Sequence, residues 1–506
     1  MTKEEEGIQR LKKFRVGTFN LNKTVFSLII ICLVMLTVYF LVFLIDDTSI
    51  FPFVNKFFPS LIFLACLLAG YCIVRRDPLY IWSPLPWFLG SCAVYYGFGP
   101  LLYHFGTTET VWYSDQFYPV GERDLLRTNM LNAAGITLVL LGYLVCMAFI
   151  HKRRGVYSTI FNTIEIKRLL FALLVIGISV KYLLVIPYRM GFLGWVLPGS
   201  ILNISQFTWV SIIVLFAIVH NGSIKYKVPL YFLIATELAV GLMSWSKLEV
   251  IVVLLMILLG KFLCEPRINR FLAGCFLIGL IYIFFLSPFV TFGRLSVRLE
   301  GTQSLGELST TLVEYAKEGR LGALGQLPGV QGWWGRLNYA NAQTFAMNSY
   351  DGGIPGDTYS LIPFTVVPRV LYPEKPLMTR GPEFNELVTG SDHAASGAGL
   401  FGEAYWNGGW LYVILSCLYA GLVFAIFAEV SMRHIAAWRL AYLPVALIGI
   451  MTGLRPDDWF VVTFVGSLLQ AILLYLVIRF FVMPGITQFP RFKNDRSGSP
   501  CSECKA

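Results

Sequence analysis

Six arginines lie in one polar stretch of the chain, between residues 294 and 408. A guanidinium group is planar and presents a fork of donors that binds phosphate oxygens in pairs. Two of the arginines stand in aromatic or proline-rich surroundings, WGRLNY and VPRVLYPEKP, which stiffen the backbone. The six are Arg294, Arg298, Arg320, Arg336, Arg369 and Arg380. The stretch therefore predicts an anion-binding surface, with ion pairs to its own carboxylates as the alternative for any one arginine.

Two candidate proton acceptors stand near the end of the same stretch. Glu403 lies in GLFGEAYWNGGW, directly before an apolar run, and His393 precedes it in SDHAASGAG. Either side chain could act as a general base toward a hydroxyl group. The alternatives are a carboxylate at a helix N-terminus for Glu403 and a solvated loop residue for His393.

Charged residues also occur inside apolar runs or at their ends. These are Lys181, Glu237, Lys247 and Arg455. A charge at bilayer depth costs about 2.5 kcal/mol or more, so it usually faces a cavity or a partner. Lys181 could instead extend to the membrane surface. Lys247 is expected at the outer tip of a tight hairpin, on the same side as the polar stretch, and Arg455 could pair within its own turn, with Asp457 and Asp458.

The rest of the chain is strongly apolar. Of its 506 residues, 56% are hydrophobic and 14% are charged. A soluble fold of this length could not cover so much apolar surface. Runs of about 18–24 apolar residues recur, each long enough to cross roughly 30 Å of hydrocarbon as a helix. Because backbone groups in lipid must be paired within their segment, we predict an all-α polytopic membrane protein.

We predict about twelve transmembrane helices from these runs. They cover roughly 24–45, 57–74, 81–103, 131–150, 169–186, 201–220, 228–246, 248–264, 271–293, 409–429, 436–454 and 460–482. With the N-terminus inside, basic clusters such as Lys152–Arg154 and Arg433–Arg439 fall in cytoplasmic connectors. The net charge of +10 is thus explained by membrane topology, and nucleic acid is not expected as a partner.

The predicted order is a cytoplasmic segment 1–23, nine helices in 24–293, a large extracytoplasmic loop 294–408, three helices in 409–482 and a cytoplasmic tail 483–506. Loops this long in compact proteins are usually functional or disordered. This one is rich in aromatic residues, so we expect short helices at the membrane interface. The chain has no phosphate-cradling GxxxxGK[ST] motif and no HExxH motif, and no metal or cofactor is expected.

Three stretches carry a resemblance to a known family: VPRVLYPEKP (367–376), GLFGEAYWNGGW (399–410) and MSWSKLEVIVVLLMILL (243–259). Together with a large outer loop late in a chain of about a dozen spans, they resemble the Wzy-type oligosaccharide repeat-unit polymerases. That group is related to the O-antigen ligases and other lipid-carrier-dependent glycosyltransferases. Lys247 stands where those families more often carry arginine.

The resemblance implies a metal-independent glycosyltransferase of the bacterial inner membrane, with both chain ends in the cytoplasm. Its donor and acceptor would be polyprenyl-pyrophosphate-linked oligosaccharides, joined at the periplasmic face during lipopolysaccharide or exopolysaccharide synthesis, with the lipid bilayer and a chain-length regulator as partners. A ligase of the same architecture and a flippase of the lipid-linked glycan are the alternatives.

The resemblance also implies roles for single residues. The catalytic candidates are Glu403, Arg369 and Arg336. The substrate-binding candidates are Arg294, Arg298, Arg380, Lys247, Tyr339, His393, Tyr405, Trp406 and Arg455. In this scheme the arginines bind pyrophosphate, the aromatic rings stack on sugars, and Glu403 orients or deprotonates the acceptor hydroxyl.

Overall fold

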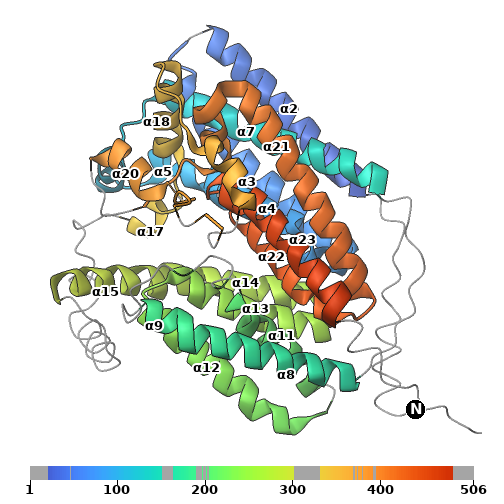
Figure 1. The fold of residues 1–506 in the computed structure, drawn as a ribbon. Helices are drawn as coiled ribbons and strands as arrows, with labels where there is room; N and C mark the ends of the chain where they lie inside the picture. Colours follow the sequence, from blue (N-terminus) through green and yellow to red (C-terminus); the bar gives the residue numbers. More distant parts are fainter. Residues whose placement is uncertain are drawn as a thin grey trace, which may run out of the picture.

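The regular structure of the chain is helical. The computed structural model describes residues 21–45, 47–150, 163–189, 197, 201, 204–220, 222–300, 331–367, 371–372, 374–378, 380–390 and 395–482. Every regular element within these ranges is a helix (Figure 1). The predicted all-α class is therefore confirmed for the described part of the chain.

Eight helices in the described ranges are long and apolar enough to cross a membrane. They include α2 (Leu21–Ile45), α3 (Phe51–Arg76), α7 (Glu122–Ile150) and α21 (Gly399–Ala436). The others are Lys167–Tyr188, Ile224–Met243, Ile268–Gly293 and Val461–Phe480, which run through α8 (Thr163–Val180), α12 (Lys227–Met243), α14 (Ile268–Ile281) and α23 (Ser467–Val477). A polytopic membrane protein follows from these helices, and twelve spans stay a prediction.

The four other predicted spans correspond to shorter or more charged helices. In the predicted span 81–103, α4 (Pro84–Cys92) is followed without a gap by the π-helix η2 (Ala93–Phe98), the 3₁₀-helix η3 (Gly99–Leu101) and α5 (Leu102–Phe105). Pro100 lacks a backbone N–H, so the α-helical hydrogen-bond pattern is interrupted there. The remaining three are α11 (Phe207–His220), α13 (Lys247–Cys264) and α22 (Leu443–Leu454).

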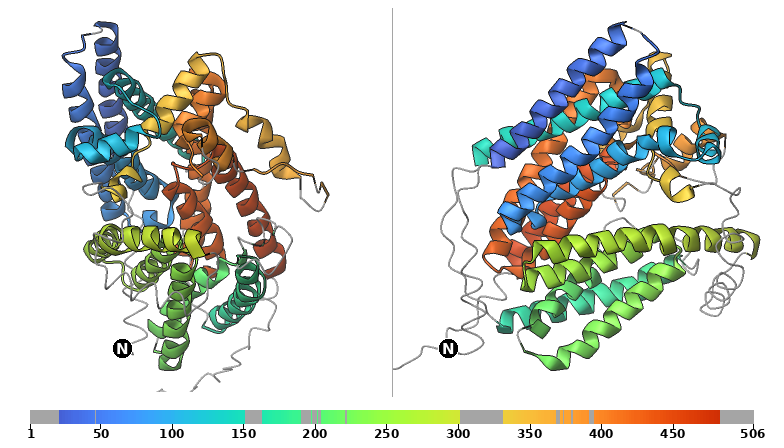
Figure 2. Two further views of the ribbon diagram at one scale, coloured as in Figure 1. Left: turned by 90° about the vertical axis from the view of Figure 1, so that its left-hand side faces the viewer. Right: turned by 180° about the vertical axis from the view of Figure 1, so that it is seen from behind.

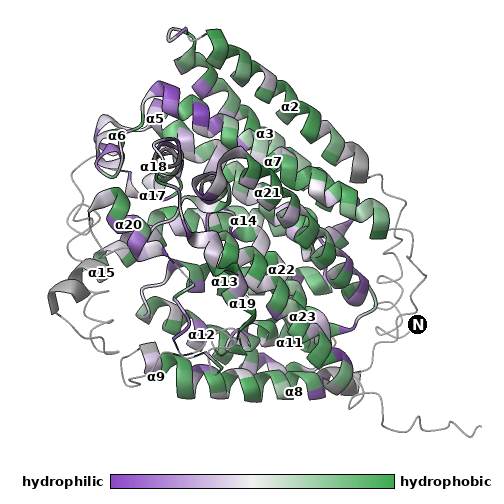
Figure 3. Cartoon of the chain, turned by 45° about the horizontal axis from the view of Figure 1, so that its top comes forward, coloured by the Kyte–Doolittle hydropathy of each residue, from purple (hydrophilic) through white to green (hydrophobic). Residues whose placement is uncertain are grey.

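The helices form two groups (Figures 1 and 2). The first group holds α8, α9 (Ile186–Arg189), α11 to α14 and α15 (Ser287–Glu300). The second group holds α2, α3, α4, α7 and α21 to α23. The flanks of both groups are apolar, whereas polar residues gather near α5, α6 (Thr108–Asp115) and α18 (Figure 3). Phe149, Phe171 and Phe232 are 80%, 71% and 70% exposed, which suits a lipid-facing surface.

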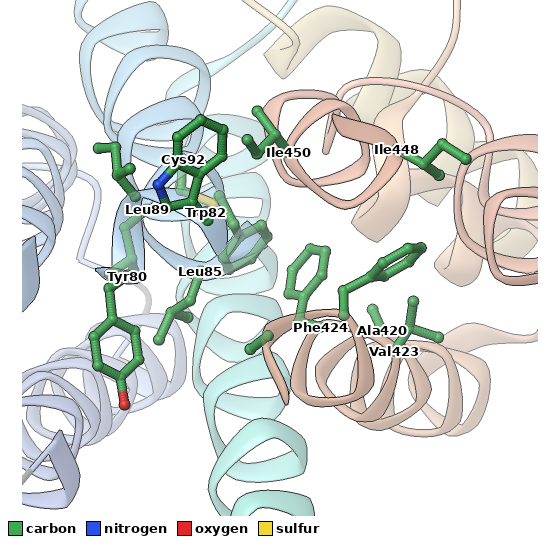
Figure 4. Packing of buried hydrophobic residues seen from close by; sticks show 14 of the residues in the cluster. Tyr80, Trp82, Leu85, Leu89, Cys92, Ala420, Val423, Phe424, Ile448 and Ile450 are labelled. Atoms are coloured by element: carbon green, nitrogen blue, oxygen red, sulfur yellow. The ribbon is translucent and has the colours of Figure 1, made fainter. Parts of the chain in front are cut away.

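Helices α7 and α21 pack closely along the centre of the second group. A Cβ atom on Gly142 would lie 2.4 Å from the Leu418 carbonyl oxygen, and one on Gly421 would lie 2.2 Å from that of Val139. These small residues let the two backbones approach. Nearby, Leu85 and Leu89 of α4 gather with Phe424 of α21 and Ile450 of α22, among other buried side chains (Figure 4).

The predicted outer loop contains short helices. These are α17 (Gly332–Gly335), α18 (Ala340–Asp351), η8 (Thr358–Leu361), α19 (Ile362–Val366) and α20 (Gly381–Thr389). Helices α17, α18 and α20 lie with α5 at one end of the molecule, at the left of Figure 1.

Two helices extend into the residues predicted as the outer loop. Helix α15 continues to Glu300, and α21 begins at Gly399, ten residues before the predicted span at 409. The bounds of the loop itself stay a prediction. The backbone is kinked at Gly408 and at Gly409, whose φ of +59° favours glycine. The segment around Glu403 is therefore helical and precedes this kink.

Candidate functional site

Glu403 is completely buried, with a relative exposure of 0%. The Thr358 hydroxyl donates to its Oε1 at 2.6 Å, and the backbone N–H of Phe460 donates to its Oε2 at 2.6 Å. Both carboxylate oxygens are therefore occupied, and they join α21 to η8 and to the start of η10 (Val461–Gly466). Each oxygen of Glu403 thus already accepts one hydrogen bond from the protein, and its predicted role as a base facing the acceptor stays a prediction.

Asn407 reinforces the same junction one helical turn later. Its Nδ2 donates to the Thr358 hydroxyl at 2.8 Å and to the Glu403 carbonyl oxygen at 2.9 Å. Its Oδ1 accepts from the backbone N–H of Tyr359 at 3.0 Å. A buried polar network that is satisfied in this way rigidifies its surroundings. Glu403 and Asn407 thus fix the described residues of 331–390, called the outer segment after their predicted location, against α21.

A second carboxylate, Asp457, has one oxygen without a partner. The Tyr339 hydroxyl donates to Asp457 Oδ2 at 2.9 Å, while Oδ1 is buried and has no hydrogen-bond partner among the described residues. Burial and the neighbouring Asp458 raise the pKa of Asp457 from 3.8 to about 6, although the Tyr339 hydrogen bond and Arg455 act in the opposite direction. At neutral pH it is therefore a carboxylate whose pKa suits proton acceptance.

Sequence reasoning treated Asp457 only as a partner within the Arg455 turn. Arg455 does pair locally, since its Nη2 lies 2.7 Å from Asp458 Oδ2. Its guanidinium group is thus shared with a neighbouring carboxylate, as the alternative interpretation expected. The sequence signal for Asp457 was limited to two adjacent acids in a short turn, and its contact with Tyr339 spans 118 residues.

Lys247 lies near Tyr282, and Arg336 interacts electrostatically with the same residue. Lys247 begins α13; its Nζ donates to the Ser287 hydroxyl at 3.0 Å and lies 5.7 Å from the centre of the Tyr282 ring. Arg336, at the C-terminal end of α17, is exposed and interacts electrostatically with the Tyr282 phenol. Two predicted cationic site residues, one on the α12–α13 hairpin and one in the outer segment, are thus brought to one tyrosine of η7 (Tyr282–Leu286).

Tyrosines connect this cationic pair to Asp457. The Tyr95 ring packs edge-on against that of Tyr339, with 5.4 Å between centroids. Tyr95 also interacts electrostatically with Asp457 and with Tyr282. Cations, phenols and one incompletely bonded carboxylate therefore occupy one region, built by η2, η7, α13, the outer segment and the turn after α22.

The Arg380 guanidinium group forms ion pairs with two carboxylates. Nη1 lies 2.5 Å from Glu383 Oε2, and Nη2 lies 3.5 Å from Asp357 Oδ2. Both carboxylates are exposed. The geometry favours the ion-pair alternative for this arginine over binding of an external anion.

Tyr405 and Trp406 belong to the packing of the outer segment. The Tyr405 hydroxyl donates to Asp351 Oδ1 at 3.0 Å, and Asp351 is also paired with Arg127. Trp406 is 7% exposed, and its ring packs against that of Phe384 at 5.2 Å. Trp406 is therefore a core residue in this structure, and its predicted role in sugar stacking stays a prediction.

The side chains of four predicted site residues lie outside the described part of the structure. Arg369 and His393 lie outside the described residues. Arg294 and Arg298 lie on α15, for which only the backbone is described at these positions. Their roles stay predictions.

The described residues contain no group of three or more His, Cys, Asp or Glu side chains arranged to hold a metal ion. No family profile, curated protein sequence or solved structure matches the chain.

Proposed function

We propose that this protein is a glycosyltransferase that joins polyprenyl-pyrophosphate-linked oligosaccharide units at the periplasmic face of the bacterial inner membrane. The observation that carries the proposal is the position of Lys247 beside Tyr282, with which Arg336 also interacts electrostatically, together with the Tyr339–Asp457 hydrogen bond next to Tyr95. Cations suit a pyrophosphate leaving group, and a carboxylate with an unbonded oxygen suits a hydroxyl nucleophile.

The proposed reaction displaces pyrophosphate from the donor sugar. The acceptor hydroxyl oxygen forms a bond to the anomeric carbon, and the bond from that carbon to the pyrophosphate oxygen breaks. The hydroxyl proton passes to the Asp457 carboxylate, and the electron pair of the broken bond leaves with the lipid pyrophosphate. Lys247 and Arg336 stabilise the negative charge that develops on that group.

Glu403 has a supporting role in this proposal. Its hydrogen bond to the backbone N–H of Phe460 holds the start of η10, directly after the turn that carries Asp457. A catalytic group needs such support, because small displacements of a reacting group reduce the rate strongly. Glu403 would thus act on the reaction through the placement of Asp457.

A ligase would use the same cations and the same carboxylate, so only the acceptor distinguishes it from a polymerase. A flippase would need charges exposed along a path through its spans. The buried charges Lys181 and Glu237 are paired with each other, which supports an enzyme over a flippase.

The test is a reaction of the purified protein with one lipid-linked repeat unit in the presence of EDTA. A product ladder spaced by one repeat unit is expected for the polymerase, and transfer only to a different lipid acceptor would identify a ligase. Lys247→Ala and Arg336→Ala should both remove the ladder. The control is Arg270→Ala, since Arg270 is exposed and pairs with Glu265 in the α13–α14 connection. Translocation of the lipid without any transfer would overturn the proposal.

A further inference from the structure

Two tryptophans adopt a backbone conformation that normally belongs to glycine. Trp245 has a φ of 47° and Trp438 a φ of 53°, and they are the non-glycine residues with positive φ in the described ranges. For a bulky residue this conformation is a genuine outlier. Outliers of this kind persist when the surrounding structure requires them.

Both tryptophans close a helix in the same way. After α12, the N–H of Trp245 bonds to the Leu242 carbonyl at 3.1 Å, and the next N–H, of Ser246, bonds to that of Gly241 at 3.2 Å. After α21, the N–H groups of Trp438 and Arg439 bond to Ile435 and His434 at 2.9 and 3.0 Å. These pairs of bonds define the Schellman motif, in which glycine is the usual residue. The backbone therefore explains the conformation, but not the choice of tryptophan.

The Trp245 side chain supplies a reason for that choice. It is 5% exposed, and its ring lies 5.2 Å from the Phe289 ring of α15. Gly293, one turn further along α15, leaves the room that the ring occupies: a Cβ atom there would lie 1.9 Å from Cζ3 of Trp245. The ring therefore fastens the tip of the α12–α13 hairpin to α15.

This contact lies next to the Lys247 ammonium group. Ser246 caps α13 by accepting the Glu249 N–H at 3.4 Å, so α13 starts at Lys247. The Lys247 Nζ donates to Ser287 at 3.0 Å, and Ser287 begins the same helix that carries Phe289. Trp245 thus connects the helix that bears the cation to the helix that bears its acceptor.

We propose that Trp245 is a positioning residue whose ring sets the place of the Lys247 ammonium group beside Ser287 and Tyr282. The role of that ammonium group in binding pyrophosphate rests on the proposed function, whereas its placement by Trp245 does not. The experiment therefore has one readout for placement and another for binding.

The first readout is the rate at which acetic anhydride labels Lys247 Nζ in the purified full-length protein, followed by mass spectrometry of the peptide. Trp245→Gly suits the cap backbone but removes the ring, so labelling should accelerate by about five- to tenfold through local opening. Gly293→Ala, which keeps the tryptophan but displaces its ring, should act in the same direction. Trp245→Phe should fall between Trp245→Gly and the unaltered protein.

Trp438→Gly is the matched control. It makes the same backbone change in the same motif, at the end of α21 opposite Glu403. Labelling of Lys247 in this variant should equal that of the unaltered protein. Equal acceleration by Trp245→Gly and Trp438→Gly, or unchanged labelling in both Trp245→Gly and Gly293→Ala, would overturn the inference.

The second readout is protection of Lys247 by inorganic pyrophosphate and the kcat/KM for the lipid-linked donor. Protection should be lost in Trp245→Gly, and kcat/KM should fall by roughly tenfold with a lower kcat, as expected when a group that stabilises the leaving pyrophosphate is displaced. If pyrophosphate gives no protection even in the unaltered protein, the proposed function loses its anion site. The positioning role is then still decided by the labelling rates.

Discussion

The hydroxyl group of Tyr339 lies 2.9 Å from Oδ2 of Asp457. This bond connects the outer segment before α18 to the turn between α22 and η10. It satisfies one oxygen of the carboxylate and leaves Oδ1 without a partner among the described residues. An acid that is held by one oxygen and unbonded at the other can be oriented and still accept a proton.

Asp457→Asn should reduce chain extension by at least about 100-fold, because an amide cannot take the acceptor proton. Folding should be preserved, since Asn keeps an oxygen for the Tyr339 hydroxyl. The measurement is the initial rate of ladder formation at pH 7.5, with the unfolding midpoint as the control for folding. A variant that still makes long polymer at an unchanged rate would exclude Asp457 as the base.

The unaltered protein should lose kcat/KM as the pH falls through about 6, the pKa of Asp457. Protonation of the carboxylate removes the base. Because this pKa is raised above its ordinary 3.8, the proton binds more tightly in the folded state. The group's contribution to stability is therefore fully present below pH 3.8 and is lost as the pH rises through 6. Protonation of Asp457 should therefore reduce activity at acid pH without destabilising the fold. A series of unfolding midpoints measured at different pH values would check this.

Tyr339→Phe should shift the acid limb of the kcat/KM profile to higher pH. The Tyr339 hydroxyl favours the charged carboxylate, so its removal raises the pKa of Asp457 further. Tyr412→Phe is the matched control, because Tyr412 is an exposed tyrosine whose ring stacks on Tyr359. A profile that moves equally in both variants, or in neither, would contradict the proposed link between Tyr339 and the base.

The helical membrane fold could be predicted because each long helix carries a continuous apolar run. The ends of the helices were harder to predict from the sequence. Helix α7 begins at Glu122 although its apolar run begins near 131, and α21 begins at Gly399 although its run begins near 409. Polar residues such as Asn129 and Glu403 extend these helices because they find buried partners, and hydropathy cannot register such partners.

Lys247 and Arg336 could be chosen as candidates from residue type and position in the chain, and their roles stay predictions. Candidates that depend on distant pairing could not be chosen in this way. Glu403 is bonded to residues 45 and 57 positions away, so its burial has no local signal. Asp457 acquires its importance from Tyr339, which only the folded chain brings near.

Glu403→Gln should act mainly on stability. The Thr358 hydroxyl and the Phe460 N–H both donate hydrogen bonds to Glu403. A glutamine has only one carbonyl oxygen, so its NH₂ group, itself a donor, would face one of these two donors. The cost of disturbing such a buried acceptor is about 1–3 kcal/mol. The measurement is unfolding in mixed micelles, and the rate per folded molecule should fall less than in Asp457→Asn. A fully stable Glu403→Gln variant without activity would instead restore Glu403 as the base.

Lys181 and Glu237 should depend on each other for stability. They form an ion pair with side-chain exposures of 5% and 0%, and the Lys181 Nζ also lies 5.3 Å from the centre of the Trp209 ring. Lys181→Met alone should cost about 3–5 kcal/mol, because it leaves the Glu237 charge buried without its partner.

The double variant Lys181→Met/Glu237→Met should recover most of that loss, since it buries no charge and Met adapts to irregular spaces. A double-mutant cycle of unfolding free energies measures this coupling. Losses that simply add would show that the pair makes no net interaction. A fully stable double variant that no longer polymerises would instead show that the pair takes part in the reaction, beyond holding η5 (Lys181–Val185) against α12.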